Sequence, residues 1–287
     1  MQNAIQPLSD TLISKSLSAA DYVPTLDAML ARTLTRIELK KTKQQRTPDE
    51  LWIVDHNDVY TLGQAGKEEH ILQRTDTPVI KTDRGGQVTW HGHGQLVLYW
   101  LFDLESLGWS VRNLVSHAEQ AIEDVINDCL QNHTAGDTRI RAQARRDAPG
   151  VYLYADTSYA DTSTEHHDSP TDQGIVSTEI QPSSIMLGKM ASLGFKIKHG
   201  FSYHGIAINL TCDLSAFNAI NPCGYAGMQM LRLADFINMA SSPKIQSTGQ
   251  AREPLSYESV TQKLIDNIAQ RHAGQIALRA LAPKPSR

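Results

Sequence analysis

The residue with the clearest potential for chemistry is Cys223, which lies in the segment Asn221-Pro222-Cys223-Gly224-Tyr225-Ala226-Gly227. Proline fixes its own φ and disfavours the helical conformation in the residue before it. The two glycines adopt backbone angles that other residues resist. The segment is therefore predicted to be a turn that presents a thiol to a substrate, as a nucleophile handling an acyl group requires. The alternative is a buried cysteine that serves packing alone.

The other two cysteines are weaker candidates for a nucleophile. Cys129 is in phase with Ile122 and Ile126 on a predicted amphipathic helix, which indicates a core position. Cys212 precedes Asp213, and a neighbouring carboxylate raises the pKa of a thiol, which makes it less reactive. With no paired cysteine motif, the sequence argues for a reducing compartment rather than a disulfide framework.

Composition limits the possible partners and locations. The chain has 287 residues, 27 basic against 31 acidic side chains and a net charge of −4, which gives no general reason to expect nucleic acid. Its first residues lack a basic segment followed by an apolar run, so we expect no signal peptide. Since no apolar stretch approaches the ~20 residues of a membrane span, we expect a cytoplasmic protein that binds no membrane.

Apolar periodicity predicts helices and strands mixed without a regular strand–helix–strand repeat. Helical spacing occurs at residues 26–37, from Ser110 as a cap to Cys129, at 230–234 and at 260–268. Strand character occurs at residues 51–54, 59–62, 78–81, 96–102, 150–154 and 203–210. This pattern favours an α+β fold, a mixed β-sheet packed with helices, and we expect a single catalytic domain over residues 1–287.

Two segments depart from this pattern. Residues 155–183 are polar and are predicted to form a mobile insertion between two strands, and residues 274–287 are predicted to be a frayed tail. The run Glu165-His166-His167-Asp168 resembles a metal site, but adjacent histidines in a strand point in opposite directions. We interpret it as a solvated loop, and we expect neither a metal ion nor a cofactor.

A second unusual block begins at Arg84, and together with Cys223 it carries a resemblance. The block Arg84-Gly85-Gly86-Gln87-Val88-Thr89-Trp90-His91-Gly92 resembles the signature of the lipoyl(octanoyl) transferases. Further blocks are similar to this family in the expected order, at residues 61–72, 147–152, 188–194, 199–205 and 220–228. The resemblance covers roughly residues 50 to 240 apart from the insertion.

The resemblance implies a fold like the catalytic domain of biotin and lipoate protein ligases. It implies transfer of an octanoyl group from octanoyl-acyl carrier protein to a lysine of lipoyl domains, in 2-oxoacid dehydrogenases and the glycine cleavage H protein. It also implies a catalytic pair, Cys223 and Lys189, through a cysteine thioester. The substrate-binding residues it implies are Arg84, Gly85, Gly86, Gln87, Val88, Thr89, Trp90, His91, Ser192, Leu193, Gly194, Gly205, Ile206 and Ala207.

The sequence departs from the family pattern at two positions besides the insertion. Phe201 stands where many members have a second cysteine, and Trp90 where tyrosine or phenylalanine is common. We expect both to alter the shape of the acyl pocket.

The proposed chemistry needs a base beside the thiol. A lysine serves as that base only where burial or a neighbouring cation favours its neutral form. Lys189 lies between Met186-Leu187 and Met190-Ala191, which is consistent with burial, although a lysine whose stem alone is buried has the same neighbours. His91 or His204 is predicted either to orient a partner or to be a hydrogen-bonded structural histidine.

Three other functions fit parts of the sequence. An ATP-dependent lipoate ligase shares the implied fold and releases AMP, although no P-loop is present. A cysteine hydrolase would release octanoate without transferring it. A non-catalytic binding protein would form no covalent adduct.

Overall fold

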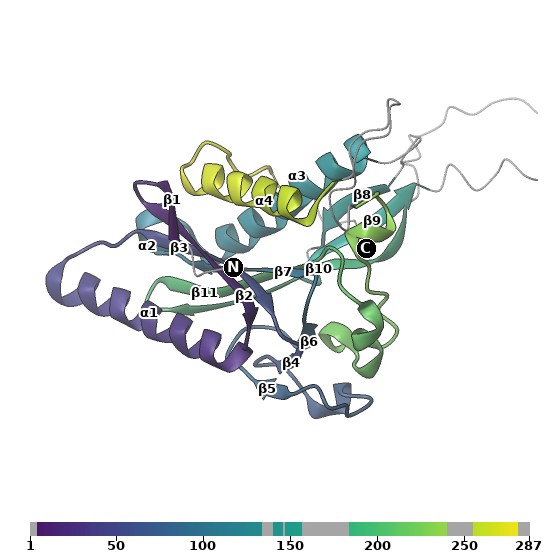
Figure 1. Cartoon of the computed structure of the whole chain (residues 1–287). Coiled ribbons are helices and arrows are strands. Elements are labelled where there is room, and N and C mark those ends of the chain that lie inside the picture. Colours follow the sequence, from purple (N-terminus) through teal and green to yellow (C-terminus); the bar gives the residue numbers. More distant parts are fainter. Residues whose placement is uncertain (1–4, 134–139, 146, 157–183, 240–254, 281–287) are drawn as a thin grey trace, which may run out of the picture.

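The computed structural model describes residues 5–133, 140–145, 147–156, 184–239 and 255–280, and it confirms the predicted α+β fold (Figure 1). An eight-stranded mixed sheet has the order β1-β2-β3-β7-β11-β10-β9-β8, and a three-stranded sheet has the order β5-β4-β6. The strands of the large sheet are β1 (Ile5–Ser9), β2 (Leu12–Ala20), β3 (Asp49–His56), β7 (Gln95–Leu101), β8 (Ile140–Ala144), β9 (Val151–Asp156), β10 (Ser184–Lys198) and β11 (Phe201–Asn209). The small sheet consists of β4 (Val59–Leu62), β5 (Val79–Lys81) and β6 (Val88–His91).

Helices cover both faces of the large sheet. Helices α3 (Val111–His133) and α4 (Tyr257–His272) lie together on one face, and α1 (Tyr22–Lys43) lies on the other (Figure 1). The short α2 (Leu104–Leu107) follows β7. Among the helices of the described residues, none is long and apolar enough to cross a bilayer.

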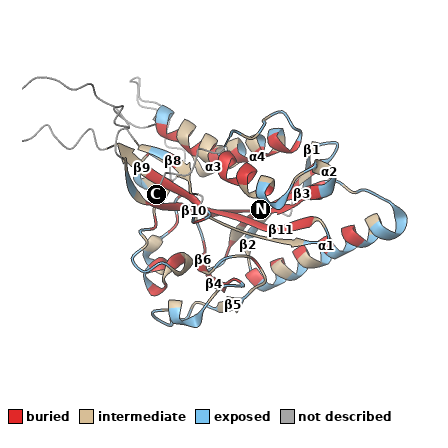
Figure 2. Ribbon diagram, turned by 180° about the vertical axis from the view of Figure 1, so that it is seen from behind, coloured by how far each residue is buried: buried red, intermediate tan, exposed pale blue. Residues whose placement is uncertain are grey.

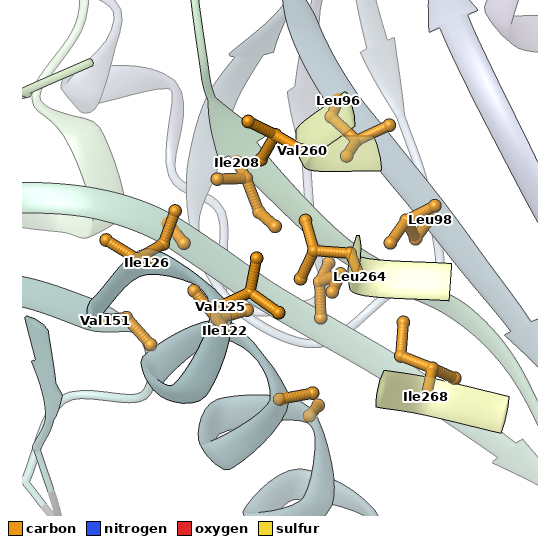
Figure 3. Close-up of a cluster of buried hydrophobic side chains, with 14 of the residues drawn as sticks. Leu96, Leu98, Ile122, Val125, Ile126, Val151, Ile208, Val260, Leu264 and Ile268 are labelled. Atoms are coloured by element: carbon orange, nitrogen blue, oxygen red, sulfur yellow. The ribbon is translucent and has the colours of Figure 1, made fainter. Parts of the chain in front are cut away.

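Strand β7 shows how the sequence produces these layers. Every residue of β7 is buried, as predicted for a central strand covered on both faces. Its neighbour β11 is also buried along its whole length (Figure 2). Because side chains alternate along a strand, Leu96 and Leu98 pack with α3 and α4, whereas Val97 and Tyr99 pack with α1. Figure 3 shows the first of these cores, in which Leu264 and Ile268 of α4 approach the sheet beside α3.

Local signals set the helix boundaries that the sequence predicted. Ser110 accepts a hydrogen bond from the Asn113 backbone N–H at 3.1 Å and so caps α3. Ser256 does the same for α4 by accepting from the Ser259 backbone N–H. Both helices then direct their apolar faces toward the sheet, which places the N-terminal end of α3 beside the cavity described below.

The expected helix at residues 230–234 is wrong. Only the short 3-10 helix η5 (Leu233–Asp235) forms there. The Lys189 N–H donates to the Gln229 carbonyl and the Leu231 N–H donates to the Lys189 carbonyl, both at 2.8 Å. Pairing with β10 satisfies these backbone groups and therefore overrides the local helical spacing.

Of the predicted insertion, residues 157–183 lie outside the described residues, as does the run at 165–168, and so do residues 281–287 of the tail. The strands that flank the insertion are confirmed: β9 and β10 are antiparallel neighbours, and Asp156 pairs with Ser184.

Helix α4 should contribute strongly to stability because Leu264 is fully buried in the core. We predict that Leu264→Ala lowers the free energy of unfolding by about 2–5 kcal/mol, since it removes buried methyl groups and leaves a cavity. Leu34→Ala is the matched control, because Leu34 on α1 is 42% exposed and should change stability by less than about 0.5 kcal/mol. Urea unfolding of both variants checks this, and equal losses would contradict the packing described.

Candidate active site

A cavity of about 370 Å³ brings together most of the residues that the sequence singled out. It lies where the Arg84–Gly86 loop and β6 meet β10 and β11, and the loop before β9 and the N-terminal end of α3 complete its wall. Both Cys223 and Lys189 line it. Of the fourteen residues that the resemblance assigned to substrate, all but Trp90 line the cavity, namely Arg84, Gly85, Gly86, Gln87, Val88, Thr89, His91, Ser192, Leu193, Gly194, Gly205, Ile206 and Ala207.

Cys223 is held in a strained turn. The short 3-10 helix η4 (Pro222–Gly224) contains Cys223 at φ 58° and ψ 16°, in the left-handed region that costs a residue with a Cβ atom about 1–2 kcal/mol. Before the turn, the Asn221 N–H donates to the His70 carbonyl at 2.8 Å. These constraints leave the thiol half-buried at the cavity, so the predicted presentation of Cys223 in a turn is confirmed.

Lys189 reaches the thiol from β10. Its Nζ lies 3.0 Å from Cys223 Sγ and donates to the Pro149 carbonyl at 2.9 Å. Irregular pairing between β10 and β9 occurs on both sides of Lys189, and such bulges change the direction of a side chain. Ser192 Oγ, farther along β10, lies 4.0 Å from the same sulfur.

Lys189 is a buried lysine and not one with an exposed amine. The residue is 2% exposed, and its Nζ lies 5.3 Å from the centroid of the Tyr152 ring. No carboxylate forms an ion pair with Lys189 within the part of the chain that the structure describes. The amine is therefore enclosed by the protein, where it contacts a thiol, a backbone carbonyl and an aromatic ring.

Arg84 organises the glycine loop beneath the cavity. Its guanidinium donates to the Thr61 carbonyl at 2.7 Å, to the Thr61 hydroxyl, and to the carbonyls of Gly85 and Gln87. A Cβ atom on Gly85 would lie 3.2 Å from the Phe195 carbonyl, and Gly86 has φ +88°. The glycines therefore allow a tight turn packed against β10.

The histidines of the cavity are neutral. Burial lowers the pKa of His91 to about 3, and its Nδ1 pairs with Gln95 Oε1 at 2.7 Å. Burial also lowers the pKa of His204, whose Nε2 lies 2.8 Å from Asp83 Oδ1. Both are hydrogen-bonded, and neither contacts Cys223 among the hydrogen bonds of the described residues. They line the cavity without adding charge to it.

Trp90 and Phe201 lie away from the cavity, so the expectation that they shape it is wrong. Trp90 packs edge-on against Phe217 in the core of the small sheet. Phe201 is buried beneath the guanidinium of Arg36. Side chains alternate along β6, so Thr89 and His91 face the cavity while Trp90 packs in the core of the small sheet. Val88, at the start of β6, belongs to that core and also borders the cavity.

The remaining cysteines are unsuited to chemistry. Cys129 is fully buried in the main core, as predicted, and burial raises its pKa to about 11. Cys212 is also buried, and its pKa is raised to about 12. Burial is the main cause of the shift at Cys212, and the Asp213 carboxylate that the sequence suggested contributes less.

The arrangement can generate a nucleophile. A thiol in contact with a neutral amine can transfer its proton and form an ammonium–thiolate pair beside a largely apolar cavity. The Lys189 amine is held by two groups of the loop before β9, the Pro149 carbonyl and Gly150. The sequence did not single out either of them as part of the site. The signal was present, because both residues lie in the block 147–152 that carried the resemblance. Val111, Val115 and Tyr225 also line the cavity and were not predicted.

Comparison with known proteins gives consistent matches over most of the chain. Residues 27–268 match the model of the lipoyl protein ligase A/B catalytic domain. The chain is 72% identical to the octanoyltransferase of Psychrobacter arcticus, over 97% of this chain and 96% of that protein. It is 45% identical to the octanoyltransferase of Acinetobacter baylyi, over 68% of this chain and 70% of that protein.

Among solved structures, P. falciparum LipL1 in complex with lipoate has a similar fold, with a TM-score of 0.52 and 11% sequence identity. The match covers 91% of this chain and 63% of LipL1. It shows a shared fold, and the match of residues 27–268 to the lipoyl protein ligase A/B catalytic domain supports the predicted fold class.

The position of Lys189 should depend on the absence of a side chain at Gly150. A Cβ atom there would lie 2.5 Å from Lys189 Cε, and Gly150 has φ +137°. We predict that Gly150→Ala slows the reaction of Cys223 with a small acyl thioester by roughly tenfold or more, because the amine is displaced from the thiol. Mass spectrometry of the acylated protein measures this rate.

Gly274→Ala is the control for backbone strain. Gly274 also has a positive φ, +72°, but an added Cβ atom would meet nothing within 4 Å. This variant should lose some stability and keep the acylation rate. Equal rates for Gly150→Ala and the wild type would show that Lys189 tolerates the added methyl group.

Proposed function

The chain belongs to the lipoyl protein ligase A/B catalytic-domain family and, within it, to the octanoyltransferases, and we propose that it carries the octanoyl group as a thioester on Cys223. The observation that carries this proposal is the 3.0 Å contact between Lys189 Nζ and Cys223 Sγ at an apolar cavity. A ligase that activates its substrate with ATP has no need for such a pair.

We propose octanoyl-acyl carrier protein as the donor. Lys189 accepts the thiol proton, and Cys223 Sγ attacks the carbonyl carbon of the octanoyl thioester. The tetrahedral intermediate collapses with cleavage of the donor C–S bond. The departing thiolate of the carrier takes the proton from Lys189 and leaves as a thiol, and the octanoyl group remains on Cys223.

The proposed acceptor is a lysine of a lipoyl domain, in 2-oxoacid dehydrogenases and the glycine cleavage H protein. Its neutral amine attacks the thioester carbon, and Lys189 accepts the proton that this amine loses. The C–S bond to Cys223 breaks, and the thiolate recovers the proton from Lys189. Donor and acceptor therefore use the same thiol in turn, which requires each to leave before the other reacts.

The octanoyl chain is proposed to lie in the cavity against the face of the paired strands β10 and β11. Ser192, Leu193 and Gly194 line the cavity from β10, and Gly205, Ile206 and Ala207 line it from β11. In the register of the sheet, His204 of β11 lies opposite Phe195 of β10. Phe195 follows Lys189 by six residues, so about 20 Å of strand separates His204 from Lys189. Leu193, Ile206 and Ala207 supply apolar side chains there, as burial of a hydrocarbon chain requires.

The nucleophile is tested by removing each thiol in turn. We predict that Cys223→Ala forms no octanoyl adduct with octanoyl-acyl carrier protein, whereas Cys129→Ala and Cys212→Ala do, because their buried thiols are not exposed to the cavity. Intact mass and peptide mapping measure the adduct. An adduct mapped to Cys129 or Cys212 would overturn the assignment, and release of octanoate without transfer to a lipoyl domain would indicate a hydrolase.

The base is tested by substitutions at Lys189. Lys189→Ala should slow both half-reactions by roughly 10²- to 10⁴-fold, the usual contribution of a general acid–base group. Lys189→Arg should not restore the rate, because a guanidinium stays protonated. Rapid-quench measurement of loading and of delivery checks both steps, with the exposed Lys198→Ala on the same strand as the control. Near-normal turnover of Lys189→Arg would show that positive charge alone suffices.

A further inference from the structure

One peptide group connects the lysine of the site to a buried carboxyl group on α3. This group is the bond between Pro149 and Gly150. Its carbonyl oxygen accepts from Lys189 Nζ at 2.9 Å, and its N–H donates to Glu119 Oε1 at 3.3 Å. Because a peptide group is planar and rigid, a force on its N–H fixes the direction of its carbonyl. Glu119 therefore acts on Lys189 without touching it.

Glu119 is an unusual residue to find at this position. It is 8% exposed, and no cation forms an ion pair with it among the described residues. Glu123, one turn farther along α3, binds the Ala144 N–H at 2.6 Å and pairs with Arg279. Glu123 thus has a neutralising partner, whereas the partner of Glu119 among the described residues is a backbone amide.

We propose that Glu119 is a positioning residue for the transfer reaction: its carboxylate fixes the Pro149–Gly150 peptide, which holds the Lys189 amine against Cys223. This inference rests on the function proposed above. Glu119 lies outside the set of cavity-lining residues, so it is not a group that contacts substrate.

Three effects make the ionised form of Glu119 the effective one. A carboxylate accepts a hydrogen bond about twice as strongly as a neutral group does. Hydrogen bonds through a shared peptide also polarise one another, so that the Pro149 carbonyl becomes a better acceptor for Lys189. In addition, the negative charge stabilises the ammonium that Lys189 becomes once it holds the thiol proton.

The charge of Glu119 is expected to change within the working range of pH. Its pKa is raised to about 7, mainly by burial and to a smaller extent by Glu123 on the same helix. The Gly150 N–H and Lys189 on β10 act in the opposite direction. Arg145 and Asp147, on the loop that carries Gly150, pair with each other at the surface. Activation by Glu119 is therefore present above about pH 7 and lost as the pH falls below it.

The same shift affects stability with the opposite sign. A carboxyl group whose pKa is higher in the folded state binds more protons there than in the unfolded chain, so stability decreases as pH rises from its ordinary range toward 7. Removing the charge should then leave the fold equally or more stable at pH 8. If replacing a residue slows the reaction yet raises the unfolding temperature, that residue serves the site and not the fold.

The test compares wild type with Glu119→Gln, which has the same shape and still accepts from Gly150. Loading of Cys223 from octanoyl-acyl carrier protein is measured by rapid quench and intact mass from pH 5.5 to 9. At each pH the wild-type rate is divided by the rate of the variant. This ratio cancels the pH dependence of the other groups that take part in the reaction. We expect a ratio near 1 at pH 5.5 that rises to roughly tenfold above pH 8, with its midpoint close to 7.

A ratio that is constant with pH would overturn the proposal, because a purely structural loss acts at every pH. Wild-type protein that forms no adduct at all would instead refute the function on which the inference rests. Thermal unfolding at pH 8 is measured on the same samples. A large decrease in the unfolding temperature of Glu119→Gln would also count against a positioning role.

Glu123→Gln provides a second, opposite readout. Glu123 raises the pKa of Glu119, so its neutralisation should lower that pKa and keep Glu119 ionised at more acidic pH. Relative to wild type, Glu123→Gln should load faster near pH 6 and equally fast above pH 8. The double variant with Glu119→Gln should lose this gain. A gain that persists in the double variant would show that another group is responsible.

Discussion

The contact between Lys189 Nζ and Cys223 Sγ is the constraint on which the rest of the site depends. The two residues are 34 positions apart in the chain, and backbone hydrogen bonds hold them together. The segment that follows the cysteine turn pairs with Lys189 through the Gln229 carbonyl and the Leu231 N–H. The lysine and the cysteine are thus fixed by pairing of their main chains, and their side chains need only span the remaining gap.

Burial acts differently on each ionisable group of the site. It raises the pKa values of Cys129 and Cys212 and removes them from competition with Cys223. It lowers the pKa values of His91 and His204 and so disfavours the charged form of both. Around Lys189 and Cys223, a carbonyl and an aromatic ring replace the solvent that the lysine has lost. The site therefore places one thiol and one amine in contact at the cavity.

Much of the fold could be predicted from local patterns. Ser110 and the apolar spacing after it located α3, and the apolar run from Leu96 located the central strand. The segment near Leu231 was misread because its backbone pairs with a distant strand, and spacing in sequence carries no information about that partner. Trp90 was assigned to the cavity because a motif does not show which face of a strand each residue occupies.

The pairing of Cys223 with Lys189 came from the family resemblance, since no periodicity relates a turn to a strand so far away. Glu119 gave no signal at all, because a glutamate on an amphipathic helix ordinarily faces water. Its significance appears only when the fold places it behind Gly150. The long-range contacts of this site are thus what the sequence could not supply.

The central claim is that Lys189 makes Cys223 the reactive thiol of the chain. The most direct measurement is the rate of alkylation of each cysteine by iodoacetamide at pH 7, in wild type and in Lys189→Met, which keeps an unbranched stem without the amine. Peptide mapping separates the three sites. We predict that Cys223 reacts far faster than Cys129 and Cys212 in the wild type and that Lys189→Met removes most of this advantage. Equal reactivity of Cys223 in both proteins, with the fold intact, would contradict the claim.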